Sequence, residues 1–331
     1  MIKKINRKFW KNKRVFITGA NGFLGSWLTK ALVDSGAKVV ILIRDWIPAS
    51  PLINMKSIYN NLEAVIKGDL LDYQLIARIL NEHNIDSCFH IGAQTIVGIA
   101  NKSPISTFES NIRGTWNILE AARSIGIQRM VVASSDKAYG EHENLPYNED
   151  YSLSALHPYD ASKACTDILA RTYANTYNMP VVVTRCANIY GGGDLNFSRI
   201  IPDTIRYILQ NKNPIIKSDG TPLRDYIYID DAVNAYLIAA EKADKEGVKG
   251  EAFNFGSNNP VKVLDLVKKI ITISGNKSLK PIVEGKSRGK GEIKNQYLSS
   301  VKAEKLLGWK PVYSLEKGLR ETIKWYKDRK Y

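Results

Sequence analysis

The sequence predicts an α/β protein with a doubly wound parallel sheet and a smaller C-terminal domain. Two observations support this fold class. Between residues 14 and 191, short apolar runs suited to buried strands alternate with helix-length segments, as in parallel sheets covered by helices. A glycine-rich turn, TGANGFLG, separates the first apolar run from the first helical segment. Such a turn is typical of Rossmann-type sheets.

The predicted elements follow in order along the chain. Strands are expected at 14–20, 38–43, 63–69, 88–94, 129–135 and 180–191, and helices at 23–36, 73–84, 107–126 and 159–178. The alternation then ends, and helices are expected within 191–210, 224–243, 261–275 and 314–329. We therefore expect a dinucleotide-binding domain from 1–187 plus about 226–257, and a substrate-binding domain from 188–225 plus 258–331.

Composition narrows the classes of function. The net charge of +14 suits an anionic ligand, but we find no nucleic-acid-binding module and no apolar stretch of roughly 20 residues that could span a membrane. The three cysteines show no spacing typical of metal ligands, so no metal is expected. The N-terminus lacks the features of a secretory signal, which predicts a cytoplasmic location.

The glycine turn carries the first chemical signal. Gly19, Gly22 and Gly25 follow the strand RVFI and open a helix. Glycines here permit a tight turn and let the backbone approach a pyrophosphate, while the helix N-terminus offers amide donors to the anion. A packing turn without a ligand is the alternative, but the strand-turn-helix setting favours a dinucleotide site.

The second signal is the pair Tyr159 and Lys163 in HPYDASK. A spacing of four residues puts both side chains on one helix face. A lysine ammonium in that position can lower the pKa of the phenol from about 10 toward neutrality. Tyr159 is then suited to act as a general base on a substrate hydroxyl.

The spacing G-x-x-G-x-x-G, the segment HIGAQT and the HPYDASK pair resemble the short-chain dehydrogenase/reductase superfamily. Over nearly the whole chain the likeness is to its extended branch, the NAD-dependent epimerase/dehydratase family, and within that branch to the CDP-glucose 4,6-dehydratases. SSDKAYG, SPISTFESNIRGTWNILEAAR and GGGDLNFSRIIPD carry this likeness. Gly140 and the segment RDYIYIDD follow the general family form instead, so the base and the sugar stay open.

The resemblance implies a nicotinamide dinucleotide, NAD, as cofactor. The residues implied to bind it are Gly19, Asn21, Gly22, Phe23, Leu24, Gly25, Arg44, Asp45, Asp69, Leu70, Gly92, Ala93, Gln94, Asn111, Tyr159 and Lys163. Arg44 suits the 2'-phosphate of NADP, whereas Asp45 suits a ribose hydroxyl. CDP-glucose dehydratases use NAD without an acid at the end of the second strand, so NAD is favoured and NADP stays open.

For the segment SSDKAYG the resemblance implies catalytic roles. Ser135 binds the 4-hydroxyl of the sugar, from which Tyr159 takes a proton while NAD takes a hydride from the same carbon. The 4-ketone acidifies the 5-hydrogen, which a neutral Lys137 removes as a protonated Asp136 donates to the departing 6-hydroxyl. Hydride return to the 6-position gives a 4-keto-6-deoxy sugar nucleotide. The acid and base roles of Asp136 and Lys137 stay interchangeable.

A nucleotide-diphosphate sugar is the implied partner. The implied contacts are Gln94, Ser135, Asn188, Arg199, Arg224 and Arg288, since arginine suits a phosphate bidentately. The resemblance also implies a homodimer or homotetramer formed through the helices at 107–126 and 159–177.

Two other functions stay open at this point. A nucleotide-sugar 4-epimerase would use Tyr159 and Lys163 without loss of water, and the pair Asp136 and Lys137 argues against it. A non-catalytic dinucleotide-binding protein would have no need of a phenol and an ammonium on one helix face.

Overall fold

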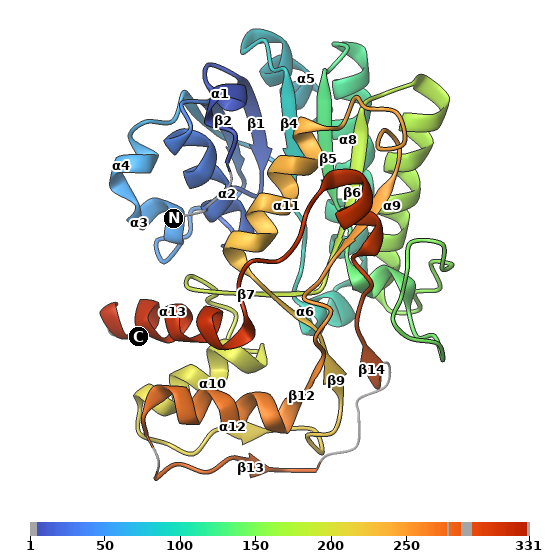
Figure 1. The fold of residues 1–331 in the computed structure, drawn as a ribbon. Coiled ribbons are helices and arrows are strands. Elements are labelled where there is room, and N and C mark those ends of the chain that lie inside the picture. Colours follow the sequence, from blue (N-terminus) through green and yellow to red (C-terminus); the bar gives the residue numbers. More distant parts are fainter. Residues whose placement is uncertain (1–4, 277, 286–292, 330–331) are drawn as a thin grey trace.

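Seven parallel strands form the central sheet, in the order β11-β6-β5-β4-β1-β2-β3. The computed structural model describes residues 5–276, 278–285 and 293–329, and Figure 1 shows the sheet above a smaller C-terminal part. The strands are β1 (Arg14–Thr18), β2 (Lys38–Ile43), β3 (Ala64–Lys67), β4 (Ser87–His90), β5 (Arg129–Ala133), β6 (Val181–Cys186) and β11 (Ala252–Phe255). The predicted fold class is confirmed.

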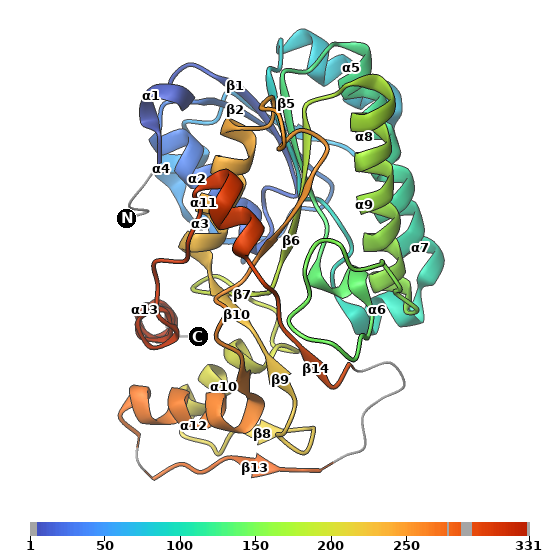
Figure 2. The same ribbon diagram turned by 45° about the vertical axis from the view of Figure 1, so that its right-hand side comes forward.

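Helices cover both faces of this sheet (Figures 1 and 2). Val15 and Ile17 of β1 pack in the core with α2 (Phe23–Asp34) and α11 (Ile229–Glu241). Phe16, between them, faces a second helical layer and its core on the other side of the sheet, because successive strand residues alternate between faces. That second layer comprises α5 (Tyr73–Glu82), α8 (Gly114–Ser124) and α9 (Pro158–Tyr177). Two buried faces explain the continuous apolar strand sequences.

The helix predicted at 107–126 is divided in the structure. It forms the end of α7 (Pro104–Phe108), a π-helical turn η1 (Glu109–Arg113) and α8. Asn111 lies in the π turn, where its main-chain oxygen accepts hydrogen bonds from Thr115 and Thr166 at 2.5 and 3.0 Å. The π turn therefore coincides with two threonine hydroxyls that donate to one helical carbonyl. Hydropathy patterning does not reveal such a turn.

The C-terminal part lies below the carboxyl ends of the sheet strands (Figure 2). Its helices are α10 (Ile200–Leu209), α12 (Val263–Ser274) and α13 (Leu315–Asp328), and its short strands are β8 (Ile215–Ile216), β9 (Leu223–Arg224), β12 (Val261–Lys262), β13 (Ile282–Val283) and β14 (Asn295–Gln296). Its apolar core is separate from the two cores of the sheet. The parallel pair β7 (Asn188–Tyr190) and β10 (Tyr226–Tyr228) connects the two parts.

Short elements complete the described chain: α1 (Arg7–Trp10), α3 (Pro51–Asn54), α4 (Lys56–Tyr59), α6 (Val97–Lys102), the 3-10 turn η2 (Asp136–Tyr139) and the π turn η3 (Ala303–Leu307). Trp309, after η3, packs on Phe255 of β11 with ring centroids 5.0 Å apart. The sequence boundaries place Trp309 in the substrate domain, whereas its side chain belongs to a core of the sheet. The division into two domains remains a proposal.

None of the helices formed by the described residues combines the length and the hydropathy that a bilayer span requires. The cytoplasmic location remains a prediction.

Candidate active site

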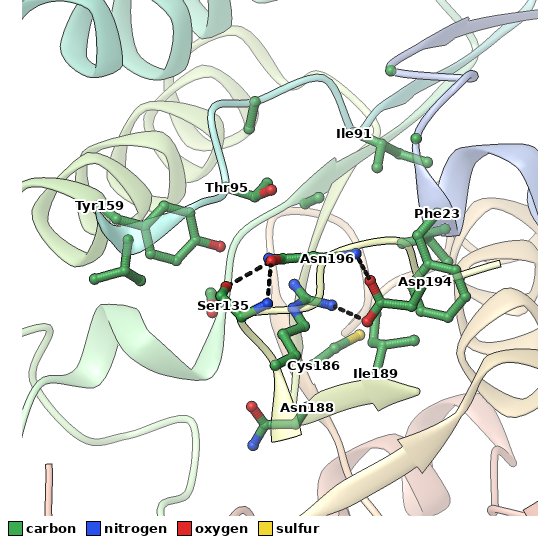
Figure 3. A pocket seen from close by; sticks show the side chains of 18 of the residues that line it. Phe23, Ile91, Thr95, Ser135, Tyr159, Cys186, Asn188, Ile189, Asp194 and Asn196 are labelled. Carbon is green, nitrogen blue, oxygen red and sulfur yellow. Dashed lines mark hydrogen bonds and ion pairs between the residues drawn. The ribbon is translucent and has the colours of Figure 1, made fainter. Parts of the chain in front are cut away.

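A cavity of about 810 Å³ opens between the carboxyl ends of the sheet strands and the C-terminal part. This is where open parallel sheets bind ligands. Figure 3 shows Tyr159 and Ser135 on one side of it and Asn188, Ile189 and Asp194 on another. The predicted site residues that line it are Gly19, Asn21, Gly22, Phe23, Leu24, Gly25, Arg44, Asp45, Asp69, Leu70, Gly92, Ala93, Ser135, Asp136, Lys137, Tyr159, Lys163, Asn188, Arg199 and Arg224.

Two predicted contacts, Gln94 and Asn111, are absent from the described lining. Arg288 lies outside the described residues. The side chain of Gln94 accepts a hydrogen bond from the Ile96 amide at 3.0 Å, so it stabilises its own loop. Asn111 is buried, accepts from the Gln94 amide at 2.7 Å and donates to Ser162 at 2.8 Å. These bonds occupy the two side-chain amides: Gln94 stabilises its own loop, and Asn111 holds that loop against α9. Direct contact of either residue with a ligand remains a proposal.

The glycine turn between β1 and α2 forms a close-packed cradle. Gly19 has φ +71°, and a Cβ there would lie 2.7 Å from the Gly92 backbone. A Cβ on Gly25 would lie 2.1 Å from the carbonyl oxygen of Gly19. Gly22 is the N-cap of α2, so the helix amides face a space bounded by backbone. The turn therefore fits a dinucleotide pyrophosphate.

Polar side chains at the end of β2 adjoin this cradle. Arg44 and Asp45 are exposed and form an ion pair of 2.7 Å. Asn21 donates to the main-chain oxygen of Asp45 at 2.9 Å, which ties this corner to the glycine turn. Asp69, at the end of β3, accepts from the Leu71 amide at 3.0 Å. A cation and a carboxylate thus both lie where the adenosine ribose of a dinucleotide would bind.

Tyr159 and Lys163 extend from the first turns of α9 toward the end of β5. Lys163 donates to the carbonyl oxygen of Ala133 at 2.7 Å, and burial lowers its pKa to about 8. Burial raises the pKa of Tyr159 to about 12, against the opposing effects of the Arg199 charge and a side-chain hydrogen bond with Ser135. A lowered phenol pKa was the wrong expectation for the protein alone, because loss of water around the phenolate outweighs the nearby cations.

Ser135, Asp136 and Lys137 form the turn that follows β5. Ser135 donates to Oδ1 of Asp136 at 3.1 Å and accepts from the Lys137 amide at 3.2 Å. Burial raises the pKa of the Asp136 carboxyl, although the charge of Lys137 and the hydrogen bond from Ser135 oppose the shift. The Asp136 carboxyl, which accepts a hydrogen bond from Ser135, therefore holds its proton to a higher pH than an exposed carboxyl would.

The arginines predicted to bind phosphate have protein partners in this structure. Arg199 is exposed and pairs with the buried Asp194 at 3.2 Å. Arg224 donates to the main-chain oxygens of Leu223, Lys294 and Ile293 at 2.9, 2.8 and 2.5 Å. Arg199 therefore has an ion-pair partner that an anionic ligand could replace, whereas much of Arg224 is engaged with backbone.

Sequence reasoning missed other residues at or beside the site. Thr95 and Asp194 line the cavity. Asp160 is buried next to Tyr159, and burial raises its pKa to about 6 while the charge of Lys137 opposes the shift. Gln296 contacts Asp136 and Lys137 from β14. Asp160 directly follows Tyr159 within HPYDASK, so its position in the sequence is a signal for it, but no local pattern indicates Gln296.

Across the ranges that the structure describes, no group of three or more histidine, cysteine, aspartate or glutamate side chains could hold a metal ion.

Comparison with known proteins now supplies a family. The sequence model of the GDP-mannose 4,6 dehydratase family matches residues 16–322. The chain belongs to this family. The membership confirms the predicted likeness to the extended short-chain dehydrogenases/reductases and to nucleotide-sugar 4,6-dehydratases.

Individual members of the dehydratase family and solved structures agree with this assignment. A CDP-glucose 4,6-dehydratase of Salmonella typhimurium is 30% identical, over 98% of this chain and 93% of the relative. A dTDP-glucose 4,6-dehydratase of Bacillus anthracis, solved with NAD, is 26% identical with a TM-score of 0.83, covering 96% of this chain and 97% of that one. A UDP-glucose 4-epimerase of Thermotoga maritima, solved with UDP-glucose, is 28% identical with a TM-score of 0.87, covering 96% and 100%.

Proposed function

We propose that this protein is a nucleotide-sugar 4,6-dehydratase of the CDP-glucose 4,6-dehydratase type. The observation that carries the proposal is the turn Ser135, Asp136 and Lys137, which lies with Tyr159 in one cavity with the glycine cradle. A carboxyl whose pKa is raised by burial, next to an amine, supplies the two groups that loss of water requires. The relative from Salmonella carries the name of this activity.

NAD is the proposed cofactor. The glycine turn with Gly19, Gly22 and Gly25 would hold its pyrophosphate, and Asp45 its adenosine ribose. When bound, it supplies the hydride acceptor and donor for the sugar carbons. The Bacillus anthracis structure, solved with NAD, supports this choice. Titration with NAD and NADP, followed by protein fluorescence, tests it: tighter binding of NADP would reassign Arg44 as a 2'-phosphate ligand.

Removal of the 4-hydroxyl proton is assigned to Tyr159. Ser135 is its hydrogen-bond partner, and Figure 3 shows the phenol directed into the cavity on the side where Ser135 and Thr95 lie. Lys163 is anchored to the Ala133 carbonyl, one helical turn after Tyr159 on the same helix face. Because burial alone favours the neutral phenol, this role requires the phenolate, which the positive charge of the nicotinamide of bound NAD would favour. A sugar hydroxyl that replaces the internal contact of Ser135 can then pass its proton to the phenolate oxygen.

Elimination of water is assigned to the neighbouring turn. Lys137 takes the proton from the 5-position, and Asp136 delivers its own proton to the oxygen that leaves the 6-position. The raised pKa of Asp136 keeps that proton available at higher pH than in an ordinary carboxyl group. Burial of the carboxyl excludes water that could compete as the proton donor.

The substrate class we propose is a nucleotide-diphosphate sugar. Arg199 would leave Asp194 and bind the diphosphate, with Asn188 on β7 close to the same wall of the cavity. Arg224 and Arg288 are kept as further proposed contacts. CDP-glucose is the first substrate to test. A panel of nucleotide sugars then identifies the base and the sugar.

Mass spectrometry of reaction products tests the function. Purified protein is incubated with CDP-, GDP-, UDP- and dTDP-linked glucose, mannose and N-acetylglucosamine, with and without NAD. Loss of one water from one substrate supports the dehydratase and names its base and sugar. An unchanged mass with a new retention time would mean a 4-epimerase, the activity named for the similar Thermotoga maritima structure. Tight NAD binding without turnover on any substrate would mean a non-catalytic binder.

A homodimer or homotetramer is also proposed. Phe108, Trp116 and Ile168 are exposed large apolar side chains on α7, α8 and α9, the region where the sequence resemblance implies an interface. Light scattering on the purified chain tests this proposal. A monomeric mass at micromolar concentration would remove it.

A further inference from the structure

Gln296 connects the catalytic turn to the C-terminal part of the protein. Its amide nitrogen donates to the main-chain oxygen of Asp136 at 2.8 Å, and its amide oxygen accepts from Nζ of Lys137 at 2.5 Å. The side chain is fully buried. One glutamine therefore contacts both residues to which we assign the elimination of water.

These two contacts determine the orientation of the Gln296 amide. The Asp136 carbonyl oxygen can only accept a hydrogen bond, so the amide nitrogen of Gln296 must face it. The amide oxygen, which also can only accept, then faces Lys137. Lys137 donates an N–H to it whether the amine is charged or neutral. In the neutral amine, the lone pair consequently points away from Gln296.

The neutrality of Gln296 has a further effect on Lys137. Among the described residues, the charge of Lys137 acts on the carboxyls of Asp136 on its own turn and Asp160 on α9, and the charge of Arg224 on β9 also acts on Asp136. Ionised carboxylates favour the ammonium form of a neighbouring lysine. The amide of Gln296 holds Nζ in place without adding a negative charge of its own. It thus orients the amine without the effect that a carboxylate in its place would have.

The segment that carries Gln296 is itself held in place. Gln296 is the strand partner of Arg224 in the parallel pair of β14 and β9. The guanidinium of Arg224 also donates to the carbonyl oxygens of Ile293 and Lys294. Gln296 is therefore supported by strand pairing and by an arginine clamp, which gives its amide a defined position over the catalytic turn.

We propose that Gln296 is a positioning residue for the elimination step, and this inference rests on the proposed dehydratase function. It directs the lone pair of neutral Lys137 toward the 5-hydrogen of the sugar and holds the main chain of Asp136. Lys137 takes the proton from carbon 5, and the released electron pair makes the bond between carbons 5 and 6 double. The bond from carbon 6 to oxygen breaks as Asp136 protonates that oxygen, and water leaves.

The first experiment needs no substrate. The full chain is treated with an amine-reactive acylating reagent across a range of pH, and labelling of Lys137 is measured by peptide mass spectrometry. Only the neutral amine reacts. Gln296→Glu keeps the shape of the side chain and adds a negative charge, so half-maximal labelling should move up by about one pH unit or more. An unchanged dependence of Lys137 labelling on pH would overturn the proposed contact between Gln296 and Lys137. Gln128→Leu, at an exposed site, is the control.

The second experiment follows the reaction with the substrate that the panel identifies. In Gln296→Leu the kcat for water loss should fall about 10- to 100-fold, while KM stays within about threefold. Sugar oxidised at the 4-position should accumulate, since Tyr159 and Lys163 are intact. Equal losses of oxidation and elimination, or an unchanged kcat, would contradict the role. A wild-type protein that never releases water would refute the proposed function, whereas the labelling result would still report the contact between Gln296 and Lys137.

Discussion

Nζ of Lys163 donates a hydrogen bond to the carbonyl oxygen of Ala133 at 2.7 Å, which ties α9 to the end of β5. Ala133 is the last residue of β5, and Ser135 follows two residues later. The helix that carries Tyr159 and the turn that carries Asp136 are therefore held together by a side chain that is itself part of the site. The position of this cation is determined by backbone rather than by another flexible side chain.

Replacement of this lysine is expected to stop the first chemical step. Lys163→Met removes a buried cation and leaves the Ala133 carbonyl without its donor, so the rate of substrate oxidation should fall about 10²- to 10⁴-fold. Single-turnover measurements of sugar oxidation check this. Lys245→Met, at an exposed position, is the matched control. Oxidation at more than a tenth of the wild-type rate would show that Lys163 is not needed for it.

Asp136 predicts a pH dependence for water loss. Burial raises the pKa of its carboxyl, so the proton that it donates is retained at higher pH than usual. The elimination rate should fall as pH rises through this raised pKa. Asp136→Asn should lower elimination about 10²-fold or more and remove that limb of the pH–rate profile, with oxidation at the 4-position retained. If the elimination rate of the variant fell over the same pH range, the fall would belong to another ionisable group.

Asp160 predicts a pH dependence for stability. Burial raises its pKa to about 6, so the folded state holds this proton more tightly than the unfolded state. Its contribution to stability is complete below the ordinary value of 3.8 and is lost as pH rises through about 6. Asp160→Asn should therefore raise the free energy of unfolding at pH 7 by about 1–3 kcal/mol and leave it unchanged at about pH 3. Urea unfolding at both pH values checks this, with exposed Asp244→Asn as the control.

The buried ion pair of Arg185 and Asp167 predicts a large effect on folding. Nε and Nη2 of Arg185 each donate to Asp167 at 2.8 Å, and Nη1 donates to the hydroxyl of Tyr139 in η2 at 2.8 Å. Arg185→Met leaves a buried carboxylate uncompensated and should cost about 3–5 kcal/mol of unfolding free energy. Denaturant unfolding measures it. A cost below about 1 kcal/mol would mean that Asp167 is neutralised in another way.

A side chain at Gly25 is expected to close the glycine turn to the cofactor. A Cβ at this position would overlap the Gly19 carbonyl oxygen, so Gly25→Ala must displace the turn or the start of α2. NAD binding should weaken at least about 10-fold, and the unfolding temperature should fall. Gly98→Ala in α6, where a Cβ meets nothing within 4 Å, is the control for the unfolding temperature alone. Wild-type NAD affinity in Gly25→Ala would exclude the cradle as the pyrophosphate site.

The sequence by itself determined the order of strands and helices, the glycine turn and the pair Tyr159 and Lys163. Each of these depends on spacing over a few residues. The strands and helices follow from apolar periodicity, the glycine turn from three closely spaced glycines, and the pair from a separation of four residues along one helix face. Residues that meet through such local geometry can be predicted without knowledge of the whole fold. The same holds for Ser135, Asp136 and Lys137, which are consecutive.

Only the tertiary structure decided what surrounds these residues. Gln296 reaches Lys137 across 159 positions of sequence, and this meeting depends on how β14 pairs with β9. Burial also reversed the pKa shift expected for Tyr159, because desolvation depends on every segment packed around the ring. Long-range contacts and solvent exclusion are properties of the packed chain, and neither leaves a local pattern in the sequence.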